Sequence, residues 1–399
     1  MVIFLNRNLR KSILQGHPWV YKEALLPISG LQGKMEASLA VLKDAKKQFL
    51  AWGIYDPHSP ISFRVLSLKD KKPDENFFAE AIKTAAQKRR FLTETQTNAF
   101  RWVNGEGDYL PGLVCDVYHN VAVLQFDGKG PEQFWGSEKI LSILRDKMPL
   151  VFKDIWGFDL QSIVIKERGA SESLKIVYGE DVPEDLVIQE NGLQFKIKVL
   201  QGQKTGFFLD QRDNRNYIRS QSKDKTVLNL FSYTGGFSMY AGAGGAKFVA
   251  SVDISKGAIV QAEDNWVLNQ FAKEKHKGFA EDVFEFLESH VDHDEWDMII
   301  VDPPSMTHSE KQKPQAITKY IEAFAKAARK VKVGGDLVLS SCSSHISFDD
   351  FDHIIQESLS QARRRGQILR ISGQGSDHPF LHVHPEMKYL KFVHLCLVP

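Results

Sequence analysis

Two polar segments that follow apolar runs could hold a nucleoside. Residues 226–231 (TVLNLF) lead into 232–237 (SYTGGF), and residues 248–252 (FVASV) end at Asp253. Glycines in the first segment let a ligand approach the backbone closely. An acid about 20 residues after such a turn can hydrogen-bond the two hydroxyls of a ribose. The pair favours an adenosine-containing ligand, and a dinucleotide would require G-x-G-x-x-G instead.

Two later segments could act on a base. The apolar run 297–301 ends in Asp302, Pro303 and Pro304, and the run 337–340 leads to Cys342. Consecutive prolines hold the backbone in a rigid extended corner, where an aspartate can contact the edge of a base. A thiol at a strand end beside that corner is a candidate nucleophile.

Structural roles remain open for several of these residues. The glycines after residue 231 could serve packing alone. Asp282 could accept a hydrogen bond from an adenine amino group, or it could cap a helix. Cys115 and Cys396 lie inside apolar runs, so we interpret both as buried structural cysteines.

The segments that must position this chemistry alternate between apolar strands and stretches of helical length. From residue 191 onward the expected strands are TVLNLF, FVASVDI, WDMIIV, DLVLSS, GQILRISG and LKFVHLCLV. Alternation of this kind predicts an α/β fold, with a parallel sheet covered by helices on both faces. Such sheets bind ligands beyond the carboxyl ends of their strands, where the candidate residues lie.

The first half of the chain has a different pattern. Short strands punctuated by Gly, Pro, Asp and Ser from Ala37 to Leu68 predict a small β-barrel, and residues 69–76 form a charged linker. A helix is expected from Phe77 to about Thr93. Residues 100–190 predict an α+β domain with one helix near 137–148. The expected domains are residues 1–73, 74–190 and 191–399.

Composition excludes several classes of protein. Of the 399 residues, 43% are hydrophobic and 25% charged, which indicates a globular chain. No apolar run approaches the roughly 18 residues that a membrane span needs, and charged residues interrupt the N-terminus before a signal sequence could form. Three cysteines without a CxxC pair favour a reducing cytoplasm. Three histidines lie close together in the sequence, His378, His382 and His384. A group of histidines without a cysteine is typical of a loop, so we expect no metal site.

Charge is unevenly distributed. Residues 1–73 carry a net charge of +7, so the remaining residues carry −6 within a total of +1. A basic end on a mildly acidic body favours a module that binds a polyanion, although a merely soluble basic surface would give the same composition.

Taken together, GQKTGFFLDQR (202–212), NLFSYTGGFS, SVDIS, VDPPS and SSCSSH resemble the ribosomal RNA large subunit methyltransferase I family, which depends on S-adenosylmethionine. GHPWVY, NGEGDYLPGLVCDVY, DHPF and YLK extend the resemblance across the chain. It implies a PUA-like RNA-binding domain, an α+β middle domain and a Rossmann-like class I methyltransferase domain with a mostly parallel seven-stranded sheet. It also implies methylation of carbon 5 of a cytosine in 23S ribosomal RNA.

The resemblance assigns roles residue by residue. Asp302 would hold the target base and Cys342 would be the nucleophile. Substrate contacts would come from Lys204, Pro303 and Pro304, with Lys204 and Phe207 also on the cofactor side. The implied cofactor-binding residues are Phe208, Asp210, Gln211, Phe231, Tyr233, Thr234, Gly235, Asp253, Asp282 and Asp302.

The sequence departs from the wider cytosine-5 RNA methyltransferases at one position. Many of them carry a second cysteine after the first motif proline, whereas this motif is DPPS, so the base that removes the C5 proton is unidentified. Methylation of an amino nitrogen is an alternative, although such enzymes usually carry an aromatic residue where Ser305 stands. A guanine N7 methyltransferase would not need Cys342. A non-catalytic RNA-binding or ribosome-assembly factor is the third alternative, and the sequence leaves a homodimer open.

Overall fold

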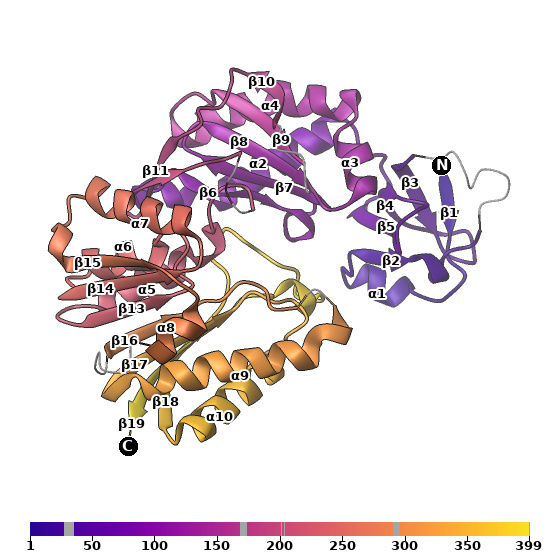
Figure 1. Ribbon diagram of the computed structural model, residues 1–399. Coiled ribbons are helices and arrows are strands. Elements are labelled where there is room, and N and C mark those ends of the chain that lie inside the picture. Colours follow the sequence, from indigo (N-terminus) through magenta and orange to yellow (C-terminus); the bar gives the residue numbers. More distant parts are fainter. Residues whose placement is uncertain are drawn as a thin grey trace. The chain divides into compact units, whose positions relative to one another are not determined.

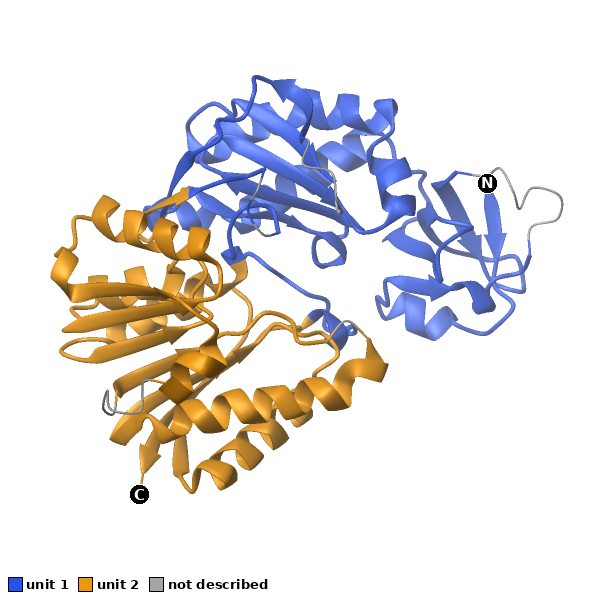
Figure 2. Cartoon of the chain, in the orientation of Figure 1, with its two compact units in different colours: residues 1–189, 197–209, 376–387 blue, residues 190–196, 210–375, 388–399 orange. Residues whose placement is uncertain are grey.

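The chain divides into two compact units, which Figure 2 colours separately. The computed structural model describes residues 1–27, 36–167, 174–200, 202, 204–289, 296–307 and 309–398. Lys34 of the basic segment and Gln203 of the motif lie outside these ranges. Unit 1 comprises residues 1–189, 197–209 and 376–387, and unit 2 comprises 190–196, 210–375 and 388–399. In the described ranges, no helix is both long and apolar enough to cross a membrane.

The N-terminal part of unit 1 is a small closed sheet. Its strand order is β1-β3-β4-β5-β2, with bounds β1 (Val2–Phe4), β2 (Trp19–Tyr21), β3 (Ser38–Lys43), β4 (Phe49–Tyr55) and β5 (Ile61–Ser67). Asn6 N donates to Ala24 O (3.0 Å) and Leu26 N donates to Phe4 O (2.8 Å), so the two edges of the sheet meet. The helix α1 (Arg10–Leu14) is the other main element. The predicted β-barrel is confirmed.

The middle part of unit 1 is a second five-stranded sheet with helices. The strand order is β10-β9-β8-β7-β6, from β6 (Ala99–Asn104), β7 (Leu113–Tyr118), β8 (Val121–Phe126), β9 (Ser162–Lys166) and β10 (Leu174–Gly179). Three helices belong to it in the described residues, α2 (Glu75–Lys88), α3 (Lys129–Trp135) and α4 (Glu138–Trp156). The prediction of one helix after residue 100 was therefore incomplete, because α3 is short and carries Gly130 and Pro131. A hairpin of β11 (Leu186–Glu190) and β12 (Leu193–Ile197) follows.

Unit 2 contains the seven-stranded sheet, in the order β15-β14-β13-β16-β17-β19-β18. Its strands are β13 (Thr226–Leu230), β14 (Phe248–Asp253), β15 (His276–Ala280), β16 (Trp296–Val301), β17 (Val331–Ser341), β18 (Arg365–Ser372) and β19 (Lys391–Val398). The first five strands pair in parallel, and β19 runs antiparallel to both β17 and β18. The predicted Rossmann-like class is confirmed, with the strand order reversing between β13 and β16 (Figure 1).

Side-chain alternation along the strands places helices on both faces of this sheet. Leu228 and Leu230 of β13 share a core with three helices, α8 (Val283–Ser289), α9 (Lys313–Arg329) and α10 (Phe348–Ala362). Between them, Asn229 faces the opposite way and donates to Ser238 of α6 (Gly236–Ala243) at 2.9 Å. Alongside α6 lies α5 (Arg212–Gln221), and α7 (Lys256–Leu268) packs on β14 and β15.

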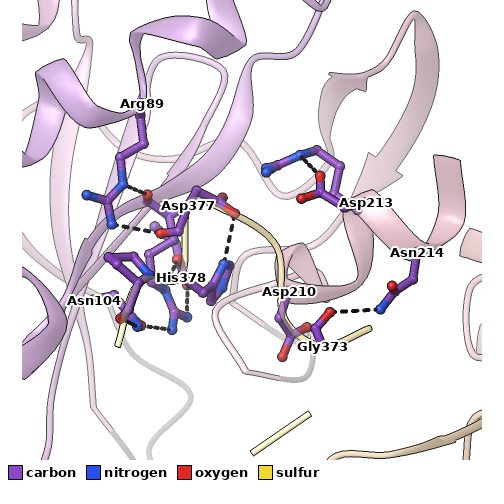
Figure 3. Close-up of polar contacts among 12 residues, drawn as sticks. Arg89, Asn104, Asp210, Asp213, Asn214, Gly373, Asp377 and His378 are labelled. Carbon is purple, nitrogen blue, oxygen red and sulfur yellow. Dashed lines mark hydrogen bonds and ion pairs between the residues drawn. The ribbon is translucent and has the colours of Figure 1, made fainter. Parts of the chain in front are cut away.

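One short segment from late in the chain belongs to unit 1. Arg89 Nη2 donates to the carbonyl of Asp377 (2.7 Å), and Asn104 Nδ2 donates to that of Pro379 (2.8 Å). The carboxylate of Asp377 contacts His378 Nδ1 (2.9 Å) and accepts from Arg101 N (2.9 Å). Figure 3 shows Arg89, Asn104, Asp377 and His378 in this arrangement. Polar contacts thus hold residues 377–379 in unit 1.

Candidate functional site

The turn after β13 has an unusual backbone. Phe231, Tyr233 and Gly235 have φ angles of 56°, 47° and 79°, in the left-handed region that non-glycine residues seldom adopt. A Cβ atom at Gly235 would lie 2.9 Å from the Cβ of Ala262, so only glycine fits there. Strain of about 1–3 kcal/mol per such residue persists only where neighbouring contacts hold the backbone. Asn265 Nδ2, which donates to Thr234 O (3.1 Å), is one such contact.

Asp253 also holds the backbone of the turn after β13, because its side chain connects that turn to the end of β14. Its carboxylate accepts from Tyr233 N and from Ser255 N, both at 2.9 Å. A carboxylate has about four lone-pair positions, so these two bonds leave acceptor capacity for a ligand hydroxyl. Beside it, the side chain of Ile254 is 74% exposed. The sequence analysis did not single out Ile254, although an apolar residue directly after a strand-end acid was a usable signal.

Asp282 serves as a helix cap. Its Oδ1 accepts from Phe284 N (2.8 Å) and Glu285 N (3.2 Å), and its carbonyl accepts from Phe286 N (2.8 Å). These are the contacts of the capping role that the sequence left open. The adenine contact of Asp282 stays a prediction.

The Asp302 corner is held by a buried glutamine. Gln211 Nε2 donates to both carboxylate oxygens of Asp302 (3.0 and 3.1 Å) and lies 3.0 Å from Ser340 Oγ. Gln211 Oε1 accepts from Asn214 Nδ2 (2.7 Å), which fixes the orientation of the amide. Asn214 also donates to the carbonyl of Gly373 (3.1 Å), the contact drawn in Figure 3. Gln211 thus bridges the Asp302 corner and β17.

The Cys342 loop contacts the same corner. Cys342 follows β17 and is partly exposed, between two buried serines. Ser343 Oγ lies 3.1 Å from Ser305 Oγ, which joins the loop to the DPPS motif. Tyr320 of α9 contacts Ser341 Oγ (3.0 Å) and Ser343 Oγ (2.9 Å). Burial raises the pKa of Tyr320 to about 12, so its hydroxyl stays protonated at neutral pH. Sequence analysis missed Tyr320, because nothing in its helical pattern marks a polar role.

The remaining predicted residues are distributed over both units. Asp210 in unit 2 is buried and accepts from Tyr389 Oη (2.6 Å). In unit 1, Phe207 is buried, and Lys204 Nζ lies 4.6 Å from the ring centroid of Phe208. The structure brings together Gln211, Asp302, Pro303, Pro304 and Cys342 around one edge of the sheet, and Phe231, Tyr233, Thr234, Gly235 and Asp253 around the neighbouring strand ends.

The other titratable candidates have structural surroundings. Burial raises the pKa of Cys115 well above its usual range, which keeps that thiol protonated and unreactive. All three cysteines lie in the described part of the chain and none is in a disulfide. Cys396 is partly exposed, so the prediction that it is a buried structural cysteine was wrong. Within the described residues, no three His, Cys, Asp or Glu side chains are grouped as metal ligands.

These donors and acceptors fit an adenosine-containing cofactor. The Ser232 hydroxyl in the turn is buried and has no partner among the described residues, and Asp253 keeps free acceptor positions.

Residues 140–364 match the S-adenosylmethionine-dependent methyltransferase family, and residues 3–68 match the PUA-like domain. The protein named Ribosomal RNA large subunit methyltransferase I of Alteromonas mediterranea is 34% identical over 98% of this chain and 97% of its own.

The chain belongs to this methyltransferase family. Another relative, the Ribosomal RNA large subunit methyltransferase of Deinococcus radiodurans, is 36% identical over 96% of this chain and 94% of its own. The fold is similar to that of a SAM-dependent methyltransferase from Streptococcus mutans, with a TM-score of 0.81 over 99% of this chain and all of that one, at 22% identity. The fold is also similar to that of a methyltransferase whose structure was solved with SAH, with a TM-score of 0.80 over 99% of both chains, at 21% identity. The predicted family and its cofactor, S-adenosylmethionine, are confirmed.

Replacing Asp253 with alanine should weaken S-adenosylmethionine binding by about 1–3 kcal/mol, because ribose hydroxyls and two backbone N–H groups would lose their acceptor. Isothermal titration calorimetry measures the loss. The matched control is Asp264→Ala, an exposed acid on the adjacent helix α7, which should leave affinity unchanged. Equal affinity of Asp253→Ala and wild type would remove Asp253 from the site.

Proposed function

We propose that this chain methylates carbon 5 of a cytosine in 23S ribosomal RNA through a covalent bond between Cys342 and carbon 6. The observation that carries the proposal is the contact between Ser305 and Ser343 at 3.1 Å. It joins the Asp302 corner to the loop that bears the thiol. A nucleophile and a group able to contact a base edge therefore lie on one side of a sheet that belongs to the S-adenosylmethionine-dependent family.

Ribosomal RNA is the substrate class that the relatives support. Two relatives that are 34% and 36% identical to the chain are named as ribosomal RNA large subunit methyltransferases. The PUA-like match over residues 3–68 lies within residues 1–73, which carry a net charge of +7, and a positive charge suits a polyanion. We place this reaction in the cytoplasm.

The cofactor contacts follow from the two strand ends. When bound, S-adenosylmethionine supplies an electrophilic methyl group. The turn of Phe231, Tyr233, Thr234 and Gly235 would surround it, with Asp253 accepting from its ribose hydroxyls. Ile254, exposed beside that acid, would offer apolar surface to the adenine ring. The second carboxylate oxygen of Asp282 would accept from the adenine amino group, because only Oδ1 is used in capping.

Cys342 and Asp302 would carry the activation of the target base. Carbon 5 of cytosine is a weak nucleophile until a thiolate adds at carbon 6 and converts the C5–C6 double bond to an enamine. Cys342 supplies that thiolate, and Asp302 in its protonated form, held by Gln211, would donate a hydrogen bond to N3 and stabilise the charge that develops there. After carbon 5 gains the methyl group, a general base, which the proposal assigns to no residue, takes the C5 proton, and the electron pair of the C–H bond restores the double bond and expels the Cys342 thiolate. The base must leave its stack for this, as in other base-modifying enzymes.

Covalent attack can be trapped. A 5-fluorocytidine substrate cannot lose its C5 substituent, so the adduct should persist after methyl transfer. Wild-type protein with 5-fluorocytidine RNA and cofactor should give a complex that survives denaturing electrophoresis. Cys342→Ala should give none and should lose methylation, while Cys115→Ala and Cys396→Ala should retain both activities.

Cofactor affinity should be close to wild type in Cys342→Ala, which separates a lost nucleophile from a misfolded protein. Methyl transfer by Cys342→Ala at a substantial rate would exclude the cytosine-5 reaction. A non-covalent methylation of a guanine or of an amino nitrogen would then explain the site better.

Charge neutralisation in the N-terminal segment tests its role in RNA binding. Replacing five exposed lysines with glutamine should weaken rRNA binding and flatten its dependence on salt, by about 0.7–0.9 in logarithmic slope for each phosphate contact removed. Filter binding over a range of salt concentrations measures both. The five are Lys11, Lys22, Lys46, Lys69 and Lys72.

The control variant removes five exposed lysines elsewhere, Lys139, Lys223, Lys247, Lys273 and Lys275. It should change the slope less than the N-terminal variant does. If both variants bind with equal affinity and slope, the basic segment does not track phosphates.

A further inference from the structure

A lysine is buried directly behind the Cys342 loop. Lys391, the first residue of β19, is 1% exposed, although lysine is rarely buried. Its ammonium group donates to the carbonyls of Ser343 (2.6 Å), Ile346 (2.7 Å) and Tyr389 (2.7 Å). All three of its donors are thus used, two of them on the loop that follows Cys342.

The lysine is fixed from the strand side as well. In the antiparallel pairing of β17 with β19, Lys391 lies opposite Ser341, the residue before Cys342. Ser340 Oγ donates to the carbonyl of Lys391 (3.0 Å) and also contacts Gln211, which holds Asp302. Lys391 therefore connects both the Cys342 loop and the Asp302 corner to β19.

This cation has no carboxylate within ion-pair distance among the described residues. Asp350 of α10, which acts on it through its charge, is paired with Lys313 instead (2.7 Å). Tyr320 of α9 is neutral, and Tyr389 contributes a carbonyl. Burial lowers the pKa of Lys391 to about 8, while the charges of Cys342 and Asp350 favour its protonated form. At neutral pH the ammonium form still predominates.

We propose that Lys391 is a positioning residue that braces the Cys342 loop and increases the fraction of Cys342 present as thiolate. The inference rests on the proposed function, in which Cys342 is the nucleophile. A nearby cation favours a thiolate over a thiol, and a buried cation is little screened by salt. Lys391 is not the base that removes the C5 proton, because its three hydrogens are directed at carbonyl oxygens.

Alkylation of the thiol without RNA tests this directly. Intact protein is treated with iodoacetamide from pH 5 to 10, and mass spectrometry follows Cys342 and Cys396 in the same sample. In the wild type, the pH midpoint for Cys342 should lie at least about one unit below that for Cys396, a partly exposed thiol away from the site. Coincident midpoints in the wild type would overturn the proposal whether or not any variant folds.

Substitution separates the charge from the packing. The glutamine in Lys391→Gln can still donate to two carbonyls but has no charge. Alkylation of Cys342 in this variant should therefore be about tenfold slower at pH 7, and the pH midpoint for Cys342 should be about one unit higher. Lys391→Arg keeps the charge and should recover most of the difference. Cofactor affinity and thermal midpoint identify folded variants. A folded Lys391→Gln with the wild-type midpoint would overturn the proposal.

Its failure differs from failure of the proposed function. A low midpoint that depends on Lys391, together with no trapped adduct on 5-fluorocytidine RNA, would support the activated thiol and exclude the cytosine-5 reaction. A trapped adduct with a midpoint that does not respond to Lys391 would exclude only the role given to the lysine.

Discussion

The alignment of three parallel strands, β14, β13 and β16, brings the turn after β13, Asp253 and Asp302 to one edge of the sheet. Their register places Leu230 beside Val252 on one side and Val301 on the other, so the three strands end at one edge. The shared register thus places Asp253 close enough to the turn after β13 to accept from Tyr233 N. The order reverses at β13, which leaves that edge open between helices packed on opposite faces.

Side-chain hydrogen bonds hold the residues at this edge in one arrangement. Asp253 holds the strained turn after β13, and Gln211 holds Asp302. Gln211 is buried, and leaving its amide unpaired would cost about 1–3 kcal/mol, so its hydrogen bonds favour a single orientation of the side chain.

The apolar runs predicted β13, β14, β16 and β17 because a strand buried on both faces needs nearly continuous hydrophobic residues. Strand ends followed, and with them the positions of Asp253, Asp302 and Cys342. The insertion of β19 between β17 and β18 was not predictable, because hydrophobic pattern does not specify pairing order. The assignment of residues 376–387 to unit 1 depends on buried polar contacts that leave no periodic signal.

Polar contacts between residues far apart in the sequence also could not be predicted. Gln211 and Asp302 are 91 positions apart, and the resemblance implied a cofactor role for Gln211 without indicating that its amide would engage the aspartate. Lys391 was part of a recognised motif, yet a lysine is expected at the surface, so its burial behind the Cys342 loop came only from the structure. Which role each residue has in catalysis stays a prediction.

Under the proposed function, this chain makes 5-methylcytidine in 23S ribosomal RNA with Cys342. Mass spectrometry of nucleosides from 23S rRNA tests it, in cells without the gene and in the same cells complemented with wild type or Cys342→Ala. In the deletion, 5-methylcytidine should fall, and it should return with wild type but not with Cys342→Ala. Unchanged 5-methylcytidine in the deletion, or its return with Cys342→Ala, would contradict it.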